Sequence, residues 1–284
     1  MQKRIFTIKK FTFGKFLVVL YLICFLLMII IPLLWMFSLS FREPGEMDKI
    51  IPLNFRFDNY TRAIELANER DYPILQMYKN SIIVSFFSVA ITIIISAVAA
   101  YAFSKLKFIG SKTIFYIILV GMVIPIQIFL IPVFIFSRYT GLLNNYLGLI
   151  LPYIAFGLPL GIFIFKGFFD QIPRELSEAA KIDGASEFRT FLKIIMPISK
   201  PAISTVIIFL FLQNWNEFIL ALVLLSRTKL YTIPVALSKF VGEFYFPWEL
   251  YSAIVFLTSI PIIIIFIIFQ NWFIKGLTAG AIKG

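Results

Sequence analysis

The amino-acid sequence predicts an all-α membrane protein with six transmembrane helices and both termini on the cytoplasmic side. Of its 284 residues 60% are hydrophobic and only 14% are charged, whereas soluble domains carry about 25% charged residues. The apolar residues, including 34 phenylalanines, gather in long runs without the alternation with charges that marks soluble helices or strands. A lipid environment explains these runs more simply than a soluble core.

Six segments are long enough to cross a bilayer, whose core of about 30 Å requires about 20 apolar residues in a helix. The segments are uncharged apart from Glu217 in the fifth, and they comprise residues 16–41, 80–104, 113–137, 139–165, 201–226 and 250–274. The basic residues before the first segment and Ser38-Leu39-Ser40 after it imitate a cleavable signal peptide. That segment is longer than the roughly 7 to 15 apolar residues of a signal peptide, so we expect an uncleaved helix.

The distribution of lysine and arginine predicts the orientation. Five lie in the N-terminal arm, residues 1–15, three between the second and third segments, six in residues 166–200 and two in the tail, residues 275–284. Those parts are predicted to be cytoplasmic. The net charge of +11 is therefore a signal of topology in a cell membrane and not of nucleic-acid binding.

Several classes of chemistry are excluded by composition. The chain has no histidine and a single cysteine, Cys24, so a disulfide framework, a Cys/His zinc site and a Ser/His or Cys/His catalytic pair cannot form. The stretch from Gly110 to Thr113 imitates a phosphate-binding loop but lacks glycines at the required offsets. We expect no cofactor, no metal site and no enzymatic activity in this chain.

Two connections within the transmembrane domain, residues 16–274, are too long to be turns. Residues 42–79 are predicted to be external, and they form either a small folded cap or a solvated spacer. Residues 170–200 are predicted to be cytoplasmic. There Pro173 suits the first position of a short helix, and Asp183-Gly184 suits its end, since glycine adopts the left-handed conformation that stops helices.

The short helix is expected to place Leu176, Ala179 and Ala180 on one face. A second amphipathic stretch follows, with its apolar face at Phe188, Phe191, Leu192 and Ile195, before Pro197 and Pro201. Physical reasoning alone leaves two interpretations of this two-helix elbow. It either docks into a partner protein or lies in the lipid headgroups as an interfacial helix.

The spacing of Glu178-Ala179-Ala180, Gly184, Ile194 and Pro197 resembles the signature loop of bacterial ABC-importer permeases. Met196 replaces the usual leucine of that pattern, an apolar exchange of similar volume. Three further stretches are similar to the maltose-type family of binding-protein-dependent carbohydrate importers, namely Trp215-Asn216-Glu217-Phe218, Ile233-Pro234-Val235 and the glycine-rich end from Gly276.

The resemblance implies a heterodimer with a second permease, a cytoplasmic ATPase dimer that hydrolyses ATP, and an external binding protein that delivers a sugar-like solute. It assigns ATPase coupling to residues of the cytoplasmic segment, namely Glu178, Ala179, Ala180, Asp183, Gly184, Ala185, Ile194 and Pro197. It implies a cytoplasmic tail contact at Gly280, Lys283 and Gly284. Candidate residues of the translocation path are Gln213, Trp215, Asn216 and Glu217.

Three alternatives stay open at this point. An ion-coupled secondary transporter would need intramembrane acids, of which only Glu217 is present. A membrane enzyme would need a catalytic set beside the polar cluster around Asn216, and a purely structural subunit is not excluded by composition. Prolines inside the apolar segments are predicted to kink their helices; these are Pro32, Pro125, Pro132, Pro152, Pro159 and Pro261.

Overall fold

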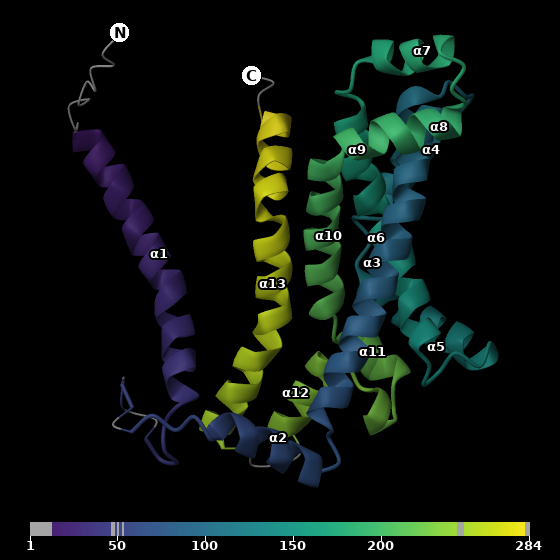
Figure 1. The fold of residues 1–284 in the computed structure, drawn as a ribbon. Coiled ribbons are helices and arrows are strands. Elements are labelled where there is room, and N and C mark those ends of the chain that lie inside the picture. The colour runs from purple at the N-terminus through teal and green to yellow at the C-terminus, as the bar shows by residue number, and fades with distance from the viewer. Residues whose placement is uncertain (1–12, 47–48, 50, 53, 243–246, 282–284) are drawn as a thin grey trace. The chain divides into compact units, whose positions relative to one another are not determined.

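A computed structural model of the chain describes residues 13–46, 49, 51–52, 54–242 and 247–281, and these residues fold into helices and their connections (Figure 1). The elements are α1 (Phe13–Leu39), α2 (Asn59–Glu69), α3 (Ile74–Lys105), α4 (Ser111–Val120), η1 (Ile126–Phe129), α5 (Leu130–Tyr139), α6 (Tyr146–Phe169), α7 (Arg174–Ile182), α8 (Glu187–Thr190), η2 (Phe191–Ile195), α9 (Met196–Ile198), α10 (Lys200–Trp215), α11 (Ile219–Leu224), η3 (Thr228–Leu230), α12 (Ile233–Gly242) and α13 (Trp248–Ala281). The all-helical fold class is confirmed.

The six-helix count is not reproduced as six continuous helices. Among the described residues four helices are long and apolar enough to cross a membrane, namely α1, α3, α6 and α13. A fifth crossing is possible if the stretch Glu187–Ile198 is joined to α10, to which it is bent by 76°. Proline explains this bend, because Pro197 and Pro201 lack the backbone N–H that a continuous helix requires.

The predicted third segment is divided into α4 and α5. The chain leaves α4 at Gly121 through a run of turns and reaches Pro125, which is extended with ψ of 133°. Proline removes a donor and disfavours helix in the residue before it, so a continuous helix stops here. Pro125 therefore breaks the segment, whereas Pro32, Pro152, Pro159 and Pro261 lie inside continuous helices.

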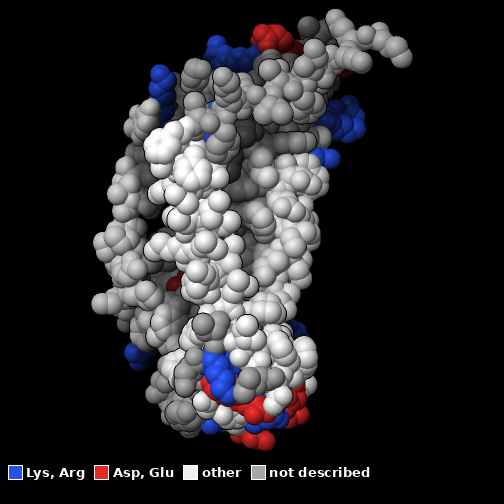
Figure 2. Space-filling model, turned by 90° about the vertical axis from the view of Figure 1, so that its left-hand side faces the viewer, with Lys and Arg blue, Asp and Glu red and all other residues white. Residues whose placement is uncertain are grey.

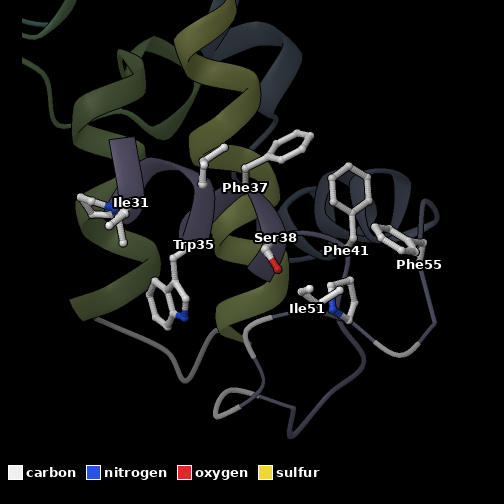
Figure 3. Close-up of a pocket in the computed structure, with 10 residues that line it drawn as sticks. Ile31, Trp35, Phe37, Ser38, Phe41, Ile51 and Phe55 are labelled. Carbon is white, nitrogen blue, oxygen red and sulfur yellow. The ribbon is translucent and has the colours of Figure 1, made fainter. Parts of the chain in front are cut away.

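The chain divides into two compact units, of which the smaller comprises residues 1–63 and 246–257. Its helix α1 is exposed along nearly its whole length. The sequence of α1 has no charged residue after Lys15. Figure 2 shows a long uncharged surface on this side of the molecule, with basic and acidic side chains gathered at one end of it. An open apolar pocket of about 690 Å³ lies between the second half of α1 and the segment that follows α1, where Trp35, Phe41 and Phe55 line it (Figure 3).

The segment after α1 is folded, which favours the cap over the solvated spacer. Buried Asn59 donates from its side-chain amide to the backbone oxygens of Ser40 at 3.1 Å and Arg42 at 2.8 Å. Phe41 packs its ring against Phe55, Phe57 and Tyr60, with centroids 5.2 to 6.0 Å apart. At the exposed edge, a hydrogen bond from Arg56 holds the pKa of the Asp58 carboxyl below its usual value.

The larger unit, residues 64–245 and 258–284, is built on close packing of α3 against α6. A Cβ added at Gly161 of α6 would lie 2.6 Å from the Ser96 Oγ and 2.8 Å from the Ser96 Cβ of α3. At Gly157 the nearest atoms, on Leu210 and Thr92, would lie 3.1 and 3.3 Å away. Small residues at such crossings let two helix backbones approach closely where lipid gives no hydrophobic drive.

One end of this pair forms a core with α11 and α12, whose fully buried members include Leu149, Leu220, Leu224 and Val235. At the other end lie α7 and α8, on the same side of the larger unit as the C-terminal end of α13 (Figure 1). That residues 170–200 and the tail lie on one side of the membrane, and that this side is cytoplasmic, stay predictions.

Candidate functional site

The helix α7 has defined ends, which follow from its sequence. It begins at Arg174, so Pro173 lies at the N-cap, one residue before its predicted place. It ends in a Schellman motif, in which the N–H of Gly184 donates to the Lys181 oxygen at 3.0 Å and that of Ala185 to the Ala180 oxygen at 2.9 Å. Gly184 has φ of +78°, as the predicted helix stop requires.

The two sides of α7 differ in exposure. Ser177 and Ala180 are buried, whereas Glu178 and Ala179 are exposed. Leu176 is also exposed, so the predicted common face of Leu176, Ala179 and Ala180 is divided between solvent and the rest of the chain. The exposed side therefore offers Leu176 and Ala179 among charged groups to another surface, and Asp183 and Gly184 are exposed at its end.

The second stretch of the elbow runs through α8, η2 and α9. Phe191 and Ile195 are buried, whereas Phe188 and Leu192 are 68% and 47% exposed, so the predicted apolar face is divided between the rest of the chain and solvent. Residues Phe191–Ile195 form one turn of π-helix within this stretch. Ile194 is half-buried and Pro197 is exposed near the bend into α10.

Two hydrogen bonds connect the elbow to α3. The Tyr101 hydroxyl of α3 donates to the Glu187 Oε2 of α8 at 2.7 Å, and Glu187 Oε1 forms an ion pair with Lys181 of α7. The Lys105 ammonium at the end of α3 donates to the Ile172 oxygen at 2.7 Å. Sequence reasoning missed the two bonds to α3, because each joins residues at least 67 positions apart along the chain.

The four candidate path residues do not form one surface. Trp215 is buried, stacks on Phe211 with centroids 5.4 Å apart and donates from Nε1 to the Thr258 oxygen of α13 at 3.1 Å. Gln213 and Asn216 are exposed, and Asn216 donates from its side chain to the Leu212 oxygen. Trp215 therefore packs inward while its two polar neighbours point away.

Glu217 lies in the break between α10 and α11. Its Oε1 accepts the N–H of Leu220 at 2.7 Å, and its Oε2 accepts the N–H of Ala221 at 3.1 Å. The Tyr153 hydroxyl of α6 donates to the same Oε2 at 2.6 Å. The carboxyl group thus satisfies N–H groups of the first turn of α11, which have no partner inside that helix, and ties this helix to α6.

Asn80 is a junction residue whose role the sequence did not reveal. It is fully buried in α3, and its amide donates to the backbone oxygens of Lys229 and Tyr231 at 3.0 and 2.9 Å. Its Oδ1 accepts from the Tyr146 hydroxyl at 2.7 Å. A buried amide at the start of an apolar segment is the signal that would have found it, because such groups need hydrogen-bond partners.

The predicted tail contact is only partly described. Gly280 lies in the last turn of α13, and Lys283 and Gly284 lie outside the described residues. Among the described residues no cluster of three or more acidic, histidine or cysteine side chains is placed to hold a metal ion.

The fold and the site define a multi-pass membrane protein with an exposed helical elbow. A family model for the inner membrane component of binding-protein-dependent transport systems matches residues 92–279. The putative ABC transporter permease protein ORF2 of Caldicellulosiruptor sp. is 37% identical over 89% of this chain and 92% of that protein. The trehalose transport system permease protein SugB of Mycobacterium tuberculosis is 37% identical over 90% and 93% of the two chains.

A third relative, the galactooligosaccharides transport system permease protein GanQ of Bacillus subtilis, is 35% identical over 93% of this chain and 94% of that protein. A chain in the crystal structure of a bacterial ABC transporter involved in the import of alginate has the same fold, with a TM-score of 0.80. The match covers 95% of this chain and 99% of that one at 24% identity. The chain belongs to the family of inner membrane components of binding-protein-dependent transport systems, and it is a transport permease subunit.

Proposed function

We propose that this chain is the transmembrane permease subunit of an ATP-driven importer in the cytoplasmic membrane. In this proposal an external binding protein delivers a sugar or sugar-like solute, and a cytoplasmic ATPase dimer drives alternating access of the path. The observation that carries the proposal is α7, an exposed helix that includes the Glu178-Ala179 pair and ends at Gly184. The hydrogen bond from Tyr101 to Glu187 joins the following helix, α8, to α3.

The class of solute is inferred from the relatives. Proteins at least 35% identical over nine-tenths of this chain are named for transport of trehalose and of galactooligosaccharides. Both solutes are carbohydrates, which supports a carbohydrate or a molecule of similar polarity here. The folded segment around Asn59 supports a site where an external binding protein docks, because its buried hydrogen bonds hold it in one shape.

The energy source is assigned to a partner. The sequence carries no phosphate-binding loop, so we infer that ATP is hydrolysed on a separate chain. An ion-coupled mechanism is disfavoured because Glu217, the acidic residue of the fifth apolar segment, accepts two backbone N–H groups and a tyrosine hydroxyl. A second permease is expected beside this one, as the family resemblance implies.

We infer that the joint with the ATPase lies on the elbow. The exposed side of α7 presents Glu178 and Ala179 of the Glu-Ala-Ala triplet, and the short side chain of Ala179 leaves room for a partner surface to approach the helix there. The turn at Gly184 sets the direction in which α8 leaves, and a β-branched residue at φ of +78° would be strained by about 1 to 2 kcal/mol.

The test compares two glycines with the same backbone conformation. Gly184 and Gly141 have φ of +78° and +72°, and a Cβ added at either would meet no atom within 4 Å. Gly141 precedes α6, whereas Gly184 follows α7. Both valine variants carry similar local strain, so only the position of the strain differs.

We expect Gly184→Val to lose copurification of the ATPase and solute-stimulated ATP hydrolysis, and Gly141→Val to retain both. Membrane insertion of the two variants is expected to be equal, because the apolar segments are unchanged. Equal ATPase recovery and equal stimulated hydrolysis in the two variants would reject the elbow as the coupling element.

A further inference from the structure

The hydrogen bond between Tyr101 and Glu187 joins the membrane part of the chain to the elbow at one defined point. Tyr101 lies one turn before the end of α3 and is 6% exposed. Its ring packs against Phe191 with centroids 5.2 Å apart, which fixes the direction of the hydroxyl. The hydroxyl then donates to Glu187 Oε2 at 2.7 Å.

Glu187 uses its two oxygens for two different elements. Oε2 accepts from Tyr101 of α3, and Oε1 pairs with Lys181 in the last turn of α7. Glu187 itself is the first residue of α8. One carboxylate therefore links three helices, and each half of the link depends on a different oxygen.

The half of the connection that joins α8 to α3 differs from an ordinary surface ion pair, whereas the half between Lys181 and Glu187 lies at the exposed surface. An isolated exposed pair contributes little to stability, because solvent screens it and long side chains lose freedom. Here one partner is a buried tyrosine held by its ring, and a charged acceptor makes the hydrogen bond stronger than a neutral one. A second bond from Lys105 to the Ile172 oxygen holds the start of the elbow to the same end of α3.

We propose that Tyr101, Glu187 and Lys181 form a strut that passes displacement of α7 to α3 when the ATPase moves. This inference rests on the proposed function, since it assigns a transmission role to the elbow. The three are positioning residues: they contact neither solute nor nucleotide. Without the strut α7 can still dock, but its movement is no longer imposed on the core formed by α3 and α6.

The strut predicts a separation between docking and coupling. Tyr101→Phe removes the hydroxyl and keeps the ring on Phe191. We expect this variant to retain ATPase copurification and to lose solute-stimulated ATP hydrolysis by about fivefold or more, the scale of a typical coupling between sites. Basal hydrolysis without solute is expected to stay unchanged. Tyr116→Phe, which removes an exposed tyrosine hydroxyl on α4, is the matched control and is expected to behave as wild type.

A second pair of variants tests the other half of the link. Lys181→Met removes the ion pair on an exposed side chain without altering the buried part of α3, and Lys181→Arg keeps the charge. We expect the methionine variant to lose stimulated hydrolysis and the arginine variant to retain it. The double variant Tyr101→Phe with Lys181→Met is expected to lose no more than the larger single loss, because residues of one network are not additive.

Several results would overturn the strut. Normal stimulated hydrolysis in Tyr101→Phe, equal loss in the arginine and methionine variants, or an additive loss in the double variant would each reject it. Loss of ATPase copurification in Tyr101→Phe, with Tyr116→Phe intact, would also reject it in favour of a docking role. If the wild-type chain itself recovers no ATPase, the proposed function fails, and this outcome is distinct because it precedes any variant.

Discussion

Substitution of Glu217 tests whether this residue stabilises the break between α10 and α11, as its contacts indicate. The carboxyl group accepts the N–H groups of Leu220 and Ala221 and the hydroxyl of Tyr153. Leu220 and Ala221 are fully buried, so their N–H groups have little access to water once the acceptor is gone. Replacement by alanine removes the acceptor of three donors at once.

The magnitude follows from those donors. A buried polar group without its partner costs about 1 to 3 kcal/mol. Glu217→Ala leaves three such groups and is therefore expected to lower the free energy of unfolding by several kcal/mol in all. Water that reaches the half-exposed site reduces this cost. Glu217→Gln keeps one carbonyl acceptor and is expected to cost about 1 to 2 kcal/mol. Tyr153→Phe removes one donor and is expected to cost about 1 kcal/mol.

The assay is thermal unfolding of the purified permease, followed by uptake kinetics of the reconstituted importer. The melting temperature is expected to be lowest for Glu217→Ala, higher for Glu217→Gln and highest for the wild type. Glu65→Ala, which removes an exposed carboxyl from α2, serves as the thermal control and is expected to melt as wild type. The double variant with Tyr153→Phe is expected to cost less than the sum of its parts, since the two groups share a bond.

The reasoning would be refuted if Glu217→Ala melted at the wild-type temperature while the KM for solute rose. That result would place Glu217 on the solute path and not at a helix cap. A fall in melting temperature with an unchanged KM would support the cap.

Two further predictions concern packing and sidedness. Gly161→Val is expected to disrupt the contact of α3 with α6, because its Cβ would lie 2.8 Å from the Ser96 Cβ, and to lower the free energy of unfolding by at least about 1 to 3 kcal/mol. The control is Gly167→Val, where a Cβ meets nothing within 4 Å. Equal melting temperatures of the two variants would contradict the packing. In a background without the native cysteine, Arg189→Cys is expected to react only with membrane-permeant thiol reagents in intact cells and Asp58→Cys with impermeant ones, and external labelling at position 189 would reverse the predicted topology.

The local features of the elbow were predictable because they depend on neighbouring residues. Asp183-Gly184 was a recognisable helix end, since glycine takes positive φ without a steric cost and follows a short helical stretch here. The apolar segments were likewise visible in the sequence, because the length needed to cross a bilayer is fixed by helix geometry.

Features that join distant segments were not predictable in this way. The close approach of Gly161 to Ser96 and the bond from Tyr101 to Glu187 depend on which helices are neighbours, and periodicity carries no such information. The break at Pro125 was predicted only as a kink, because a proline inside a membrane helix is tolerated whenever the freed backbone groups find partners.

The most direct test of the central claim is a crosslink from α7 to the ATPase. Ala179 is exposed and Ala180 is buried against the rest of the chain, so adjacent cysteines probe the two sides of one helix. In a background lacking Cys24, Ala179→Cys is expected to form a crosslink with cysteines introduced into the ATPase surface, and Ala180→Cys is not. Absence of a crosslink at position 179 in a complex that hydrolyses ATP in response to solute, or equal crosslinking at both positions, would contradict the assignment of α7 as the coupling helix.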